Sequence, residues 1–242
     1  MDQCKSFCAP RRKIFFARSN MTMENLAVAI VGGTGNLGSA LALRLGAPGV
    51  KIIIGSRDAE KAKKVVETLK PNLRAGEMIG TTNREAVKDA NFVVIAVPYE
   101  GQAQMVQDLK GQLAGKIVID TVVPLNKIKP FVPPAGSALQ EAQQIIGDEA
   151  PVIGALHNIS AVDLGDIDAP LGDVLVCGDN AEAKQKVMEI IARIGATAYD
   201  GGPASNAYVI EGLTGVIIAL NRKYKSKHGS IKITGIGGQS GY

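Results

Sequence analysis

The chain has 242 residues, 46% of them hydrophobic, and a formal net charge of +4. This length suits one sizeable α/β domain with a small appendage. No apolar run approaches the roughly 18 residues of a membrane span, and Cys4, Cys8 and Cys177 form neither a disulfide framework nor a zinc-ligand spacing. The sequence therefore predicts no membrane segment and no metal site, and a reducing cytoplasm is the expected location.

Residues 1–22 contain five basic side chains and one acidic side chain, which accounts for the whole net charge. The rest of the chain balances 22 basic against 22 acidic residues, so no nucleic-acid surface is expected. The segment is Arg-rich like a targeting peptide, but its apolar core is too short for a secretory signal. The alternative is that translation starts at Met21 or Met23. In either case we expect 1–22 to be an N-terminal extension.

Short β-rich runs alternate with helical patterns along the rest of the chain. Strands are expected at Leu26–Val31, Lys51–Ile54, Glu77–Thr81, Asn91–Val97, Lys116–Asp120, Pro151–Leu156, Val174–Cys177 and Thr197–Asp200. Uninterrupted apolar runs are typical of parallel strands buried on both faces. Intervening helices such as Asp58–Lys70 and Ala181–Ile194 place apolar residues on one face. This order predicts an α/β fold with a doubly wound, mostly parallel sheet of eight strands, of the Rossmann NAD(P)-binding type.

A last long helix is expected at about Ser205–Lys223, ahead of a basic tail dotted with glycines. Only 42 residues follow Asp200, so a small C-terminal helical lobe is the most that can be added to the sheet. The sequence therefore divides into an N-terminal extension (1–22), a dinucleotide-binding domain (23–200) and a C-terminal lobe and tail (201–242).

A glycine-rich loop follows the first expected strand and opens the helix Leu37–Leu45. Its residues are Gly33, Thr34, Gly35, Asn36, Leu37 and Gly38. In a G-x-G-x-x-G loop the first glycine makes a tight turn, the second lets a diphosphate approach the backbone, and the third lets the helix pack on the strand. The helix amino terminus then offers free N–H groups to the anion. The strand–loop–helix context favours dinucleotide binding over a purely structural turn.

The choice of nucleotide depends on the end of the second expected strand. NAD-binding chains usually place Asp or Glu there, which accepts from the ribose 2′-hydroxyl and would repel a 2′-phosphate. Here Ser56 can donate a hydroxyl, Arg57 a guanidinium fork, and Lys61 lies one helical turn further on. Asp58 is contrary evidence, but one position past the arginine it can cap the helix instead. The pattern favours NADP.

Six segments, in this order, resemble the family of reduced coenzyme F-420:NADP oxidoreductases. They are GGTGNLGSALALRL, IIIGSRDAEKA, VVIAVPYE, DTVVPL, GALHNISA and EGLTGVIIALNRKYKSKHGSIKITGI. The resemblance spans about residues 26–236. It implies an NADPH-dependent F-420 reductase, which passes a hydride between NADP and an 8-hydroxy-5-deazaflavin that serves as substrate.

The resemblance also implies roles for individual residues. It places Thr34, Ser56, Arg57 and Lys61 around the adenosine 2′-phosphate. It places Val97 and Pro98 beside the nicotinamide ribose and counts Val122 among the cofactor-binding residues. His157 and Thr214 would line the deazaflavin as catalytic residues. Gly212 stands where well-known archaeal members have a serine, so one hydrogen bond to the deazaflavin is in doubt.

Direct hydride transfer between two rings needs no acid–base pair, because the cofactors carry the reaction and the protein orients them. The Tyr-x-x-x-Lys pattern of carbonyl reductases is missing at Tyr99 and at Tyr224. The residue four positions after each tyrosine is not lysine but Ala103 and His228, respectively. A proton released from the deazaflavin could pass to solvent or through His157.

Structural interpretations remain open beside the catalytic ones. His157 could simply satisfy backbone groups in a loop, and Thr214 could bond the carbonyl four residues earlier. Two other functions also remain possible for the chain. One is a non-catalytic NADP-binding redox sensor, and the other is an NADPH-dependent reductase with a flavin or metal acceptor. A homodimer that takes small-molecule cofactors as substrates is the expected assembly.

Overall fold

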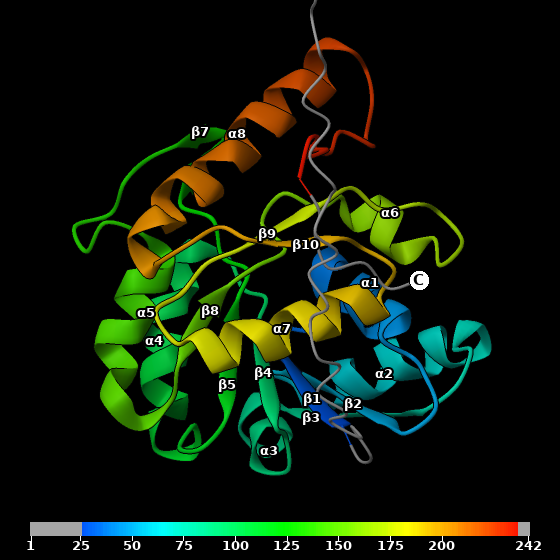
Figure 1. Cartoon of the computed structure of the whole chain (residues 1–242). Coiled ribbons are helices and arrows are strands. Elements are labelled where there is room, and N and C mark those ends of the chain that lie inside the picture. Colours follow the sequence, from blue (N-terminus) through cyan, green and yellow to red (C-terminus); the bar gives the residue numbers. More distant parts are fainter. Residues whose placement is uncertain (1–25, 237–242) are drawn as a thin grey trace, which may run out of the picture.

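The computed structural model describes residues 26–236, shown in Figure 1. The expected N-terminal extension, residues 1–22, lies outside the described residues, as do residues 237–242.

A six-stranded sheet forms the centre of the fold. Its strands are β1 (Leu26–Val31), β2 (Val50–Ser56), β3 (Glu77–Thr82), β4 (Phe92–Ile95), β5 (Ile117–Asp120) and β8 (Val152–Gly154). The order is β3-β2-β1-β4-β5-β8, and each neighbouring pair is parallel. This is the strand order of a dinucleotide-binding fold. Strands β2 and β3 are added on one side of β1, and β4, β5 and β8 on the other, so the order of addition switches sides between β1 and β4.

The prediction of an eight-stranded sheet is wrong, because the main sheet has six strands and the last two expected strands lie outside it. β9 (Val174–Val176) and β10 (Ala198–Asp200) form a separate parallel pair. They join the edge of the main sheet through one antiparallel bridge between Gly154 and Cys177, with N–H to O distances of 2.8 and 3.0 Å. The bridge does not extend into a ladder, since the next residue, Gly178 (φ +155°), donates its N–H to the Gly202 carbonyl oxygen at 3.1 Å. A short hairpin, β6 (Leu125–Asn126) and β7 (Lys129–Pro130), was not expected from the sequence.

Helices cover both faces of the sheet. One core cluster joins α1 (Asn36–Arg44), α2 (Ala59–Leu69) and α7 (Ala181–Arg193) to one face. The other joins α3 (Asn83–Lys88), α4 (Tyr99–Leu109) and α5 (Ala138–Ile146) to the opposite face. Alternate residues of β1 enter different cores, since Val28 and Ile30 belong to the first cluster and Ala29 and Val31 to the second. Burial on both sides explains the uninterrupted apolar runs.

The C-terminal helix α8 (Ala207–Lys223) lies beside β7, as Figure 1 shows in orange. The side chain of Glu211 fastens it to the sheet domain. This carboxylate is 1% exposed and accepts hydrogen bonds from the backbone N–H groups of Ala138 (3.0 Å) and Leu139 (3.1 Å) at the start of α5. The short helix α6 (Ala161–Gly165) follows β8. Among the described residues no helix combines the length and apolarity needed to cross a bilayer.

Candidate active site

The residues singled out in the sequence follow the carboxyl ends of five parallel strands. The glycine loop follows β1, Arg57 follows β2, Val97 and Pro98 follow β4, Val122 follows β5 and His157 follows β8. Because the strands are parallel, these loops meet at one edge of the sheet. The change of direction between β1 and β4 opens the crevice in which such folds bind ligands.

The glycines of the loop differ in the space around them. A Cβ on Gly33 would lie 2.7 Å from the Ile30 carbonyl oxygen, and one on Gly38 would lie 2.6 Å from Gly33 Cα. The same atom on Gly35 would meet only the Gly32 carbonyl oxygen, at 3.5 Å. Gly33 and Gly38 are therefore needed for packing of the protein itself. The space at Gly35 is left open, as close approach of a diphosphate requires.

The amino terminus of α1 is suited to an anion. Gly35 occupies the N-cap position, so no side chain bonds the first N–H groups, and the first turn contains no acidic residue. Gly35 and Asn36 are exposed, Thr34 is half-buried, and half-buried Leu37 packs against the core. The first four N–H groups of a helix have no partner within it and carry the positive end of its dipole. This terminus can therefore hold a phosphate group.

The end of β2 presents two unpaired cations. Arg57 and Lys61 are exposed, and neither side chain hydrogen-bonds or ion-pairs with any residue in the range 26–236. The Asp58 carboxylate instead caps α2 and accepts from the backbone N–H groups of Glu60 (2.9 Å) and Lys61 (3.3 Å). This confirms the interpretation of Asp58 as a cap. Ser56 is buried, and its hydroxyl accepts from the Asp58 N–H at 3.2 Å.

The end of β4 lies against the start of the glycine loop. A Cβ on Gly32 would lie 2.7 Å from Val97 Cγ1, and Gly32 has a φ of +73° that suits glycine. Pro98 is exposed at the N-cap of α4. Val122 is only 2% exposed and contributes its side chain to the core, while its N–H donates to Asp120 Oδ1 at 3.1 Å. Val97 and Pro98 can therefore contact a ligand directly, whereas the side chain of Val122 belongs to the core.

His157 and Thr214 are brought together from distant parts of the chain. The Thr214 hydroxyl donates to the His157 carbonyl oxygen at 2.7 Å, so the expected structural alternative, a bond to the carbonyl four residues earlier, is not formed. The residue before the histidine, Leu156, has a φ of +66°, which is unusual for a side chain branched beyond Cβ. Such strained residues cluster at functional sites.

The imidazole of His157 is buried without a partner. Its residue is 4% exposed, and no hydrogen-bonding group in the described part of the chain reaches either ring nitrogen. Burial lowers its pKa to about 4, so the ring is neutral near pH 7. The alternative that His157 merely satisfies loop backbone groups through its ring is therefore wrong. A neutral imidazole has one donor nitrogen and one acceptor nitrogen, and here both are covered by the described part of the protein without being hydrogen-bonded.

A cavity of about 410 Å³ opens beside this pair. Its lining includes His157, Asn158, Thr214, Ile217, Arg222 and Lys227. Asn158 is 2% exposed and donates from Nδ2 to the Asp173 carbonyl oxygen at 2.7 Å, but its Oδ1 meets no donor within residues 26–236. Gly212 does not line this cavity, and a Cβ there would approach Pro130 Cβ at 4.0 Å on the hairpin side of α8.

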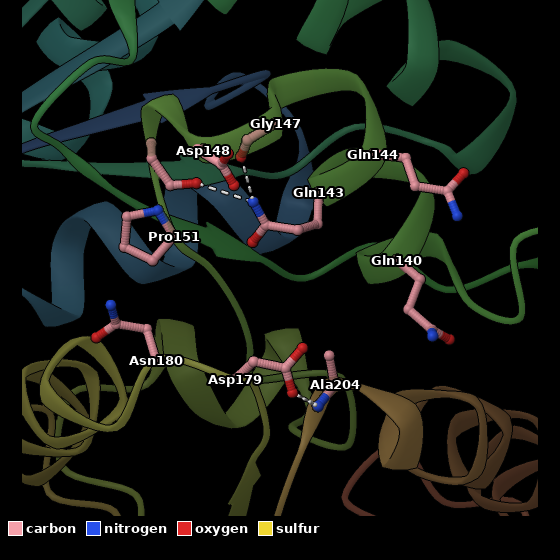
Figure 2. Close-up of a pocket in the computed structure, with 10 residues that line it drawn as sticks. Gln140, Gln143, Gln144, Gly147, Asp148, Pro151, Asp179, Asn180 and Ala204 are labelled. Carbon is pink, nitrogen blue, oxygen red and sulfur yellow. Dashed lines mark hydrogen bonds between the residues drawn. The ribbon is translucent and has the colours of Figure 1, made fainter.

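A second cavity, of about 590 Å³, contains none of the residues singled out in the sequence (Figure 2). It lies between α5 and the start of α7, and its polar side chains already serve the fold. Gln143 Nε2 donates to the carbonyl oxygens of Gly147 (2.8 Å) and Ala150 (3.1 Å), and Asp179 accepts from the Ala204 N–H at 2.8 Å. These bonds are drawn in Figure 2. This second cavity is therefore not the candidate site.

Two buried polar residues near the site were missed by sequence reasoning. Asp120, at the end of β5, is fully buried, and burial raises its pKa to about 7. Asn83, the first residue of α3, is 7% exposed and accepts a hydrogen bond from the Gly32 N–H at 3.2 Å. Both are polar residues at the carboxyl end of a strand, and this position was the only feature of the sequence that could have identified them.

Comparison with known proteins agrees with this geometry. Residues 27–124 match the family described as NADP oxidoreductase coenzyme F420-dependent. The chain is 40% identical over 223 residues to an F420-dependent NADP reductase of Methanocaldococcus jannaschii, covering 87% of this chain and 99% of that protein. It is 27% identical to the rat (Rattus norvegicus) metalloreductase STEAP3 over 75% of this chain and 35% of that protein.

A solved structure, the ternary complex of a GDP-mannose dehydrogenase from Pseudomonas aeruginosa, shares the fold with a TM-score of 0.60 at 14% identity. The match covers 82% of this chain and 50% of that one. At this identity the likeness concerns the fold alone. The identity and coverage of the archaeal reductase go further, and they show that the chain belongs to the family of F420-dependent NADP reductases.

Proposed function

We propose that this protein is an oxidoreductase that transfers a hydride between NADP(H) and coenzyme F420. The proposal rests on one observation, which is that three features suited to the two cofactors lie at the same edge of the sheet. This edge presents a glycine loop with open space at Gly35, exposed cations at Arg57 and Lys61, and a buried His157, and within residues 26–236 neither the cations nor the imidazole has a partner. The archaeal relative, similar along nearly its whole length, is named for this reaction.

The protein's residues bind and orient the two cofactors. The open backbone at Gly35 and the amino terminus of α1 hold the diphosphate, while Arg57 and Lys61 neutralise the 2′-phosphate. Val97 and Pro98 place the nicotinamide end of the molecule. When bound, the nicotinamide and deazaflavin rings supply the hydride chemistry, so the chain needs no acid–base pair at the reacting carbons.

His157 and Thr214 serve the deazaflavin side of the site. His157 lines the cavity on this side, and the hydrogen bond from Thr214 fixes the backbone that carries its neutral imidazole. A buried imidazole with no protein partner loses hydrogen bonds that it had in water, which is costly unless a ligand restores them.

The test is a reaction with NADPH and a choice of acceptors. NADPH is mixed with oxidised F420, with FMN or with ferric citrate, and both NADPH loss and the change in the acceptor's absorbance are followed. We expect rapid turnover when F420 is the acceptor, and none with FMN or ferric citrate. Turnover with FMN or ferric citrate but not F420 would favour the flavin or metal-acceptor alternative. NADPH binding without turnover on any acceptor would favour the redox sensor.

We further propose that two copies associate through α8. Val209, Val216 and Leu220 lie on one face of this helix and are 56%, 53% and 47% exposed. Apolar stripes of this kind are typical of interfaces, and a two-fold axis lets a stripe pack against its own copy. Val216→Glu should convert a dimer into a monomer in light scattering, whereas Val162→Glu, the same change on exposed α6, should not. The cytoplasmic location stays a prediction for cell fractionation.

A further inference from the structure

Asn83 lies between the two parts of the molecule that would hold the diphosphate and the 2′-phosphate of NADP. It is the first residue of α3, directly after Thr82 of β3, and Thr82 is paired with Ser56 of β2. Its side chain is nearly buried and points to the glycine loop, where Oδ1 accepts from the Gly32 N–H at 3.2 Å. Asn83 therefore connects the end of β3 to the start of the loop after β1.

The Gly32 N–H depends on this acceptor. Gly32 leaves β1 with a φ of +73° and lies against the end of β4, where a Cβ would approach the Ala96 carbonyl oxygen at 2.6 Å. Gly32 is half-buried, so its N–H has limited access to water, and the Asn83 amide oxygen supplies the partner. The other amide atom, Nδ2, points to Met105 Sδ on α4 at 3.5 Å. The amide orientation is thus held from both sides.

Asn83 also explains the glycine that precedes Ser56. A Cβ on Gly55 would lie 2.8 Å from Asn83 Oδ1 and 3.1 Å from Asn83 Cα, so the asparagine occupies the space that a side chain would need. In addition, the Gly55 carbonyl oxygen accepts from the Gly33 N–H at 2.9 Å. The end of β2, the glycine loop and Asn83 therefore form one packed unit.

We propose that Asn83 is a positioning residue for NADP, which sets the glycine loop at a fixed distance from the 2′-phosphate site at Arg57. The inference rests on the proposed nucleotide binding but not on the identity of the hydride acceptor. NADP spans both sites, with its diphosphate at the loop and its 2′-phosphate beyond β2. A shift of the loop relative to β2 should lower the affinity for a ligand that must contact both sites, and should leave the affinity for a ligand that contacts only one site unchanged.

The test compares two ligands and two matched variants by calorimetry. NADP covers both sites, whereas adenosine 2′-monophosphate covers only the site at Arg57. The first variant is Asn83→Ala. The control is Asn91→Ala, because Asn91 Oδ1 makes the same kind of bond, to the Ala27 N–H at 3.0 Å, at the opposite end of β1. Melting temperatures without ligand report the structural cost of each change.

We expect Asn83→Ala to weaken NADP binding by about tenfold or more while adenosine 2′-monophosphate changes by less than about twofold. Asn91→Ala should leave both ligands within about twofold at a comparable drop in melting temperature. If Asn83→Ala does not fold, Asn83→Ser, which is too short to reach Gly32, gives the same comparison. Equal losses for both ligands, or unchanged NADP binding, would overturn the inference. A wild-type protein that binds NADP but does not reduce F420 would instead refute the proposed function.

Discussion

The hydroxyl of Thr214 donates to the carbonyl oxygen of His157 at 2.7 Å, across 57 positions of sequence. This bond joins α8 to the loop after β8, directly beyond the strained Leu156. A strained residue persists only where the surroundings hold it, and Thr214 is one of the groups that do so. Thr214 therefore acts on the histidine through the backbone, in addition to any contact of its own with a ligand.

Thr214→Val keeps the shape of the side chain and removes the donor. A neutral hydrogen bond is worth about 0.5–1.5 kcal/mol, so the KM for F420 should rise roughly two- to tenfold while the affinity for NADP is unchanged. Steady-state kinetics with each substrate varied in turn measure both. Thr214→Ser restores the donor and should restore the KM. A variant with valine that retains the wild-type KM would show that the bond has no role in binding F420.

Arg57→Ala should change the preference for the nucleotide. A charge-assisted hydrogen bond contributes about 1.5–3 kcal/mol, so NADP should bind roughly ten- to a hundredfold more weakly, with NAD nearly unaffected. Titration calorimetry with both nucleotides measures this. Lys63→Ala is the matched control, because Lys63 is an exposed cation of α2 that already pairs with Glu60 at 2.7 Å. Equal losses for NADP and NAD would mean that Arg57 is structural.

Gly35→Val should separate ligand binding from folding. Gly35 has an extended backbone, with φ −81° and ψ 169°, that valine readily adopts, and a Cβ there meets only one protein atom. The melting temperature without ligand should therefore stay within a few degrees, while NADP binding is lost because the side chain fills the open space. Gly38→Ala is the contrasting variant and should lower the melting temperature itself, since its Cβ would clash with Gly33. Normal NADP binding by Gly35→Val would contradict the assigned phosphate site.

The stability contributed by two buried carboxyl groups should fall as the pH rises toward about 8. Burial raises the pKa of Asp120 to about 7 and that of Glu211 to about 8. A carboxyl group with a raised folded pKa stabilises the fold while protonated, and that contribution is lost as the pH rises through the folded value. Between about pH 6.5 and 8 the folded His157 is neutral and the unfolded imidazole, with a pKa near 6.5, loses its remaining charge, which opposes the decrease only in part.

Urea denaturation across this range should therefore show a decreasing free energy of unfolding. Glu211→Gln removes one of the two titrating groups and should flatten the decrease. Glu189→Gln, on α7, serves as a matched control and should leave the slope unchanged. A pH-independent free energy of unfolding in the wild type would contradict the buried, protonated state of these two carboxyl groups.

Much of the nucleotide half of the fold could be predicted from local sequence. The strands β1, β2 and β4 appear as apolar runs because both of their faces are buried, and the glycine loop has a fixed position between strand and helix. The pairing of β9 and β10 could not be predicted in this way. Their sequences are typical of buried strands, but the edge that a strand joins depends on packing with residues far away in the sequence.

The sequence by itself determined the fold class, the glycine loop between strand and helix, and the cap at Asp58, because each depends on residues within a few positions of one another. Only the tertiary structure decided that Thr214 bonds to His157, that the His157 ring has no hydrogen-bond partner in the described part of the chain, and that Asn83 accepts from the Gly32 N–H. The physical reason is distance along the chain. These contacts join residues 51 and 57 positions apart, and they exist only after helices and strands have packed into a common core.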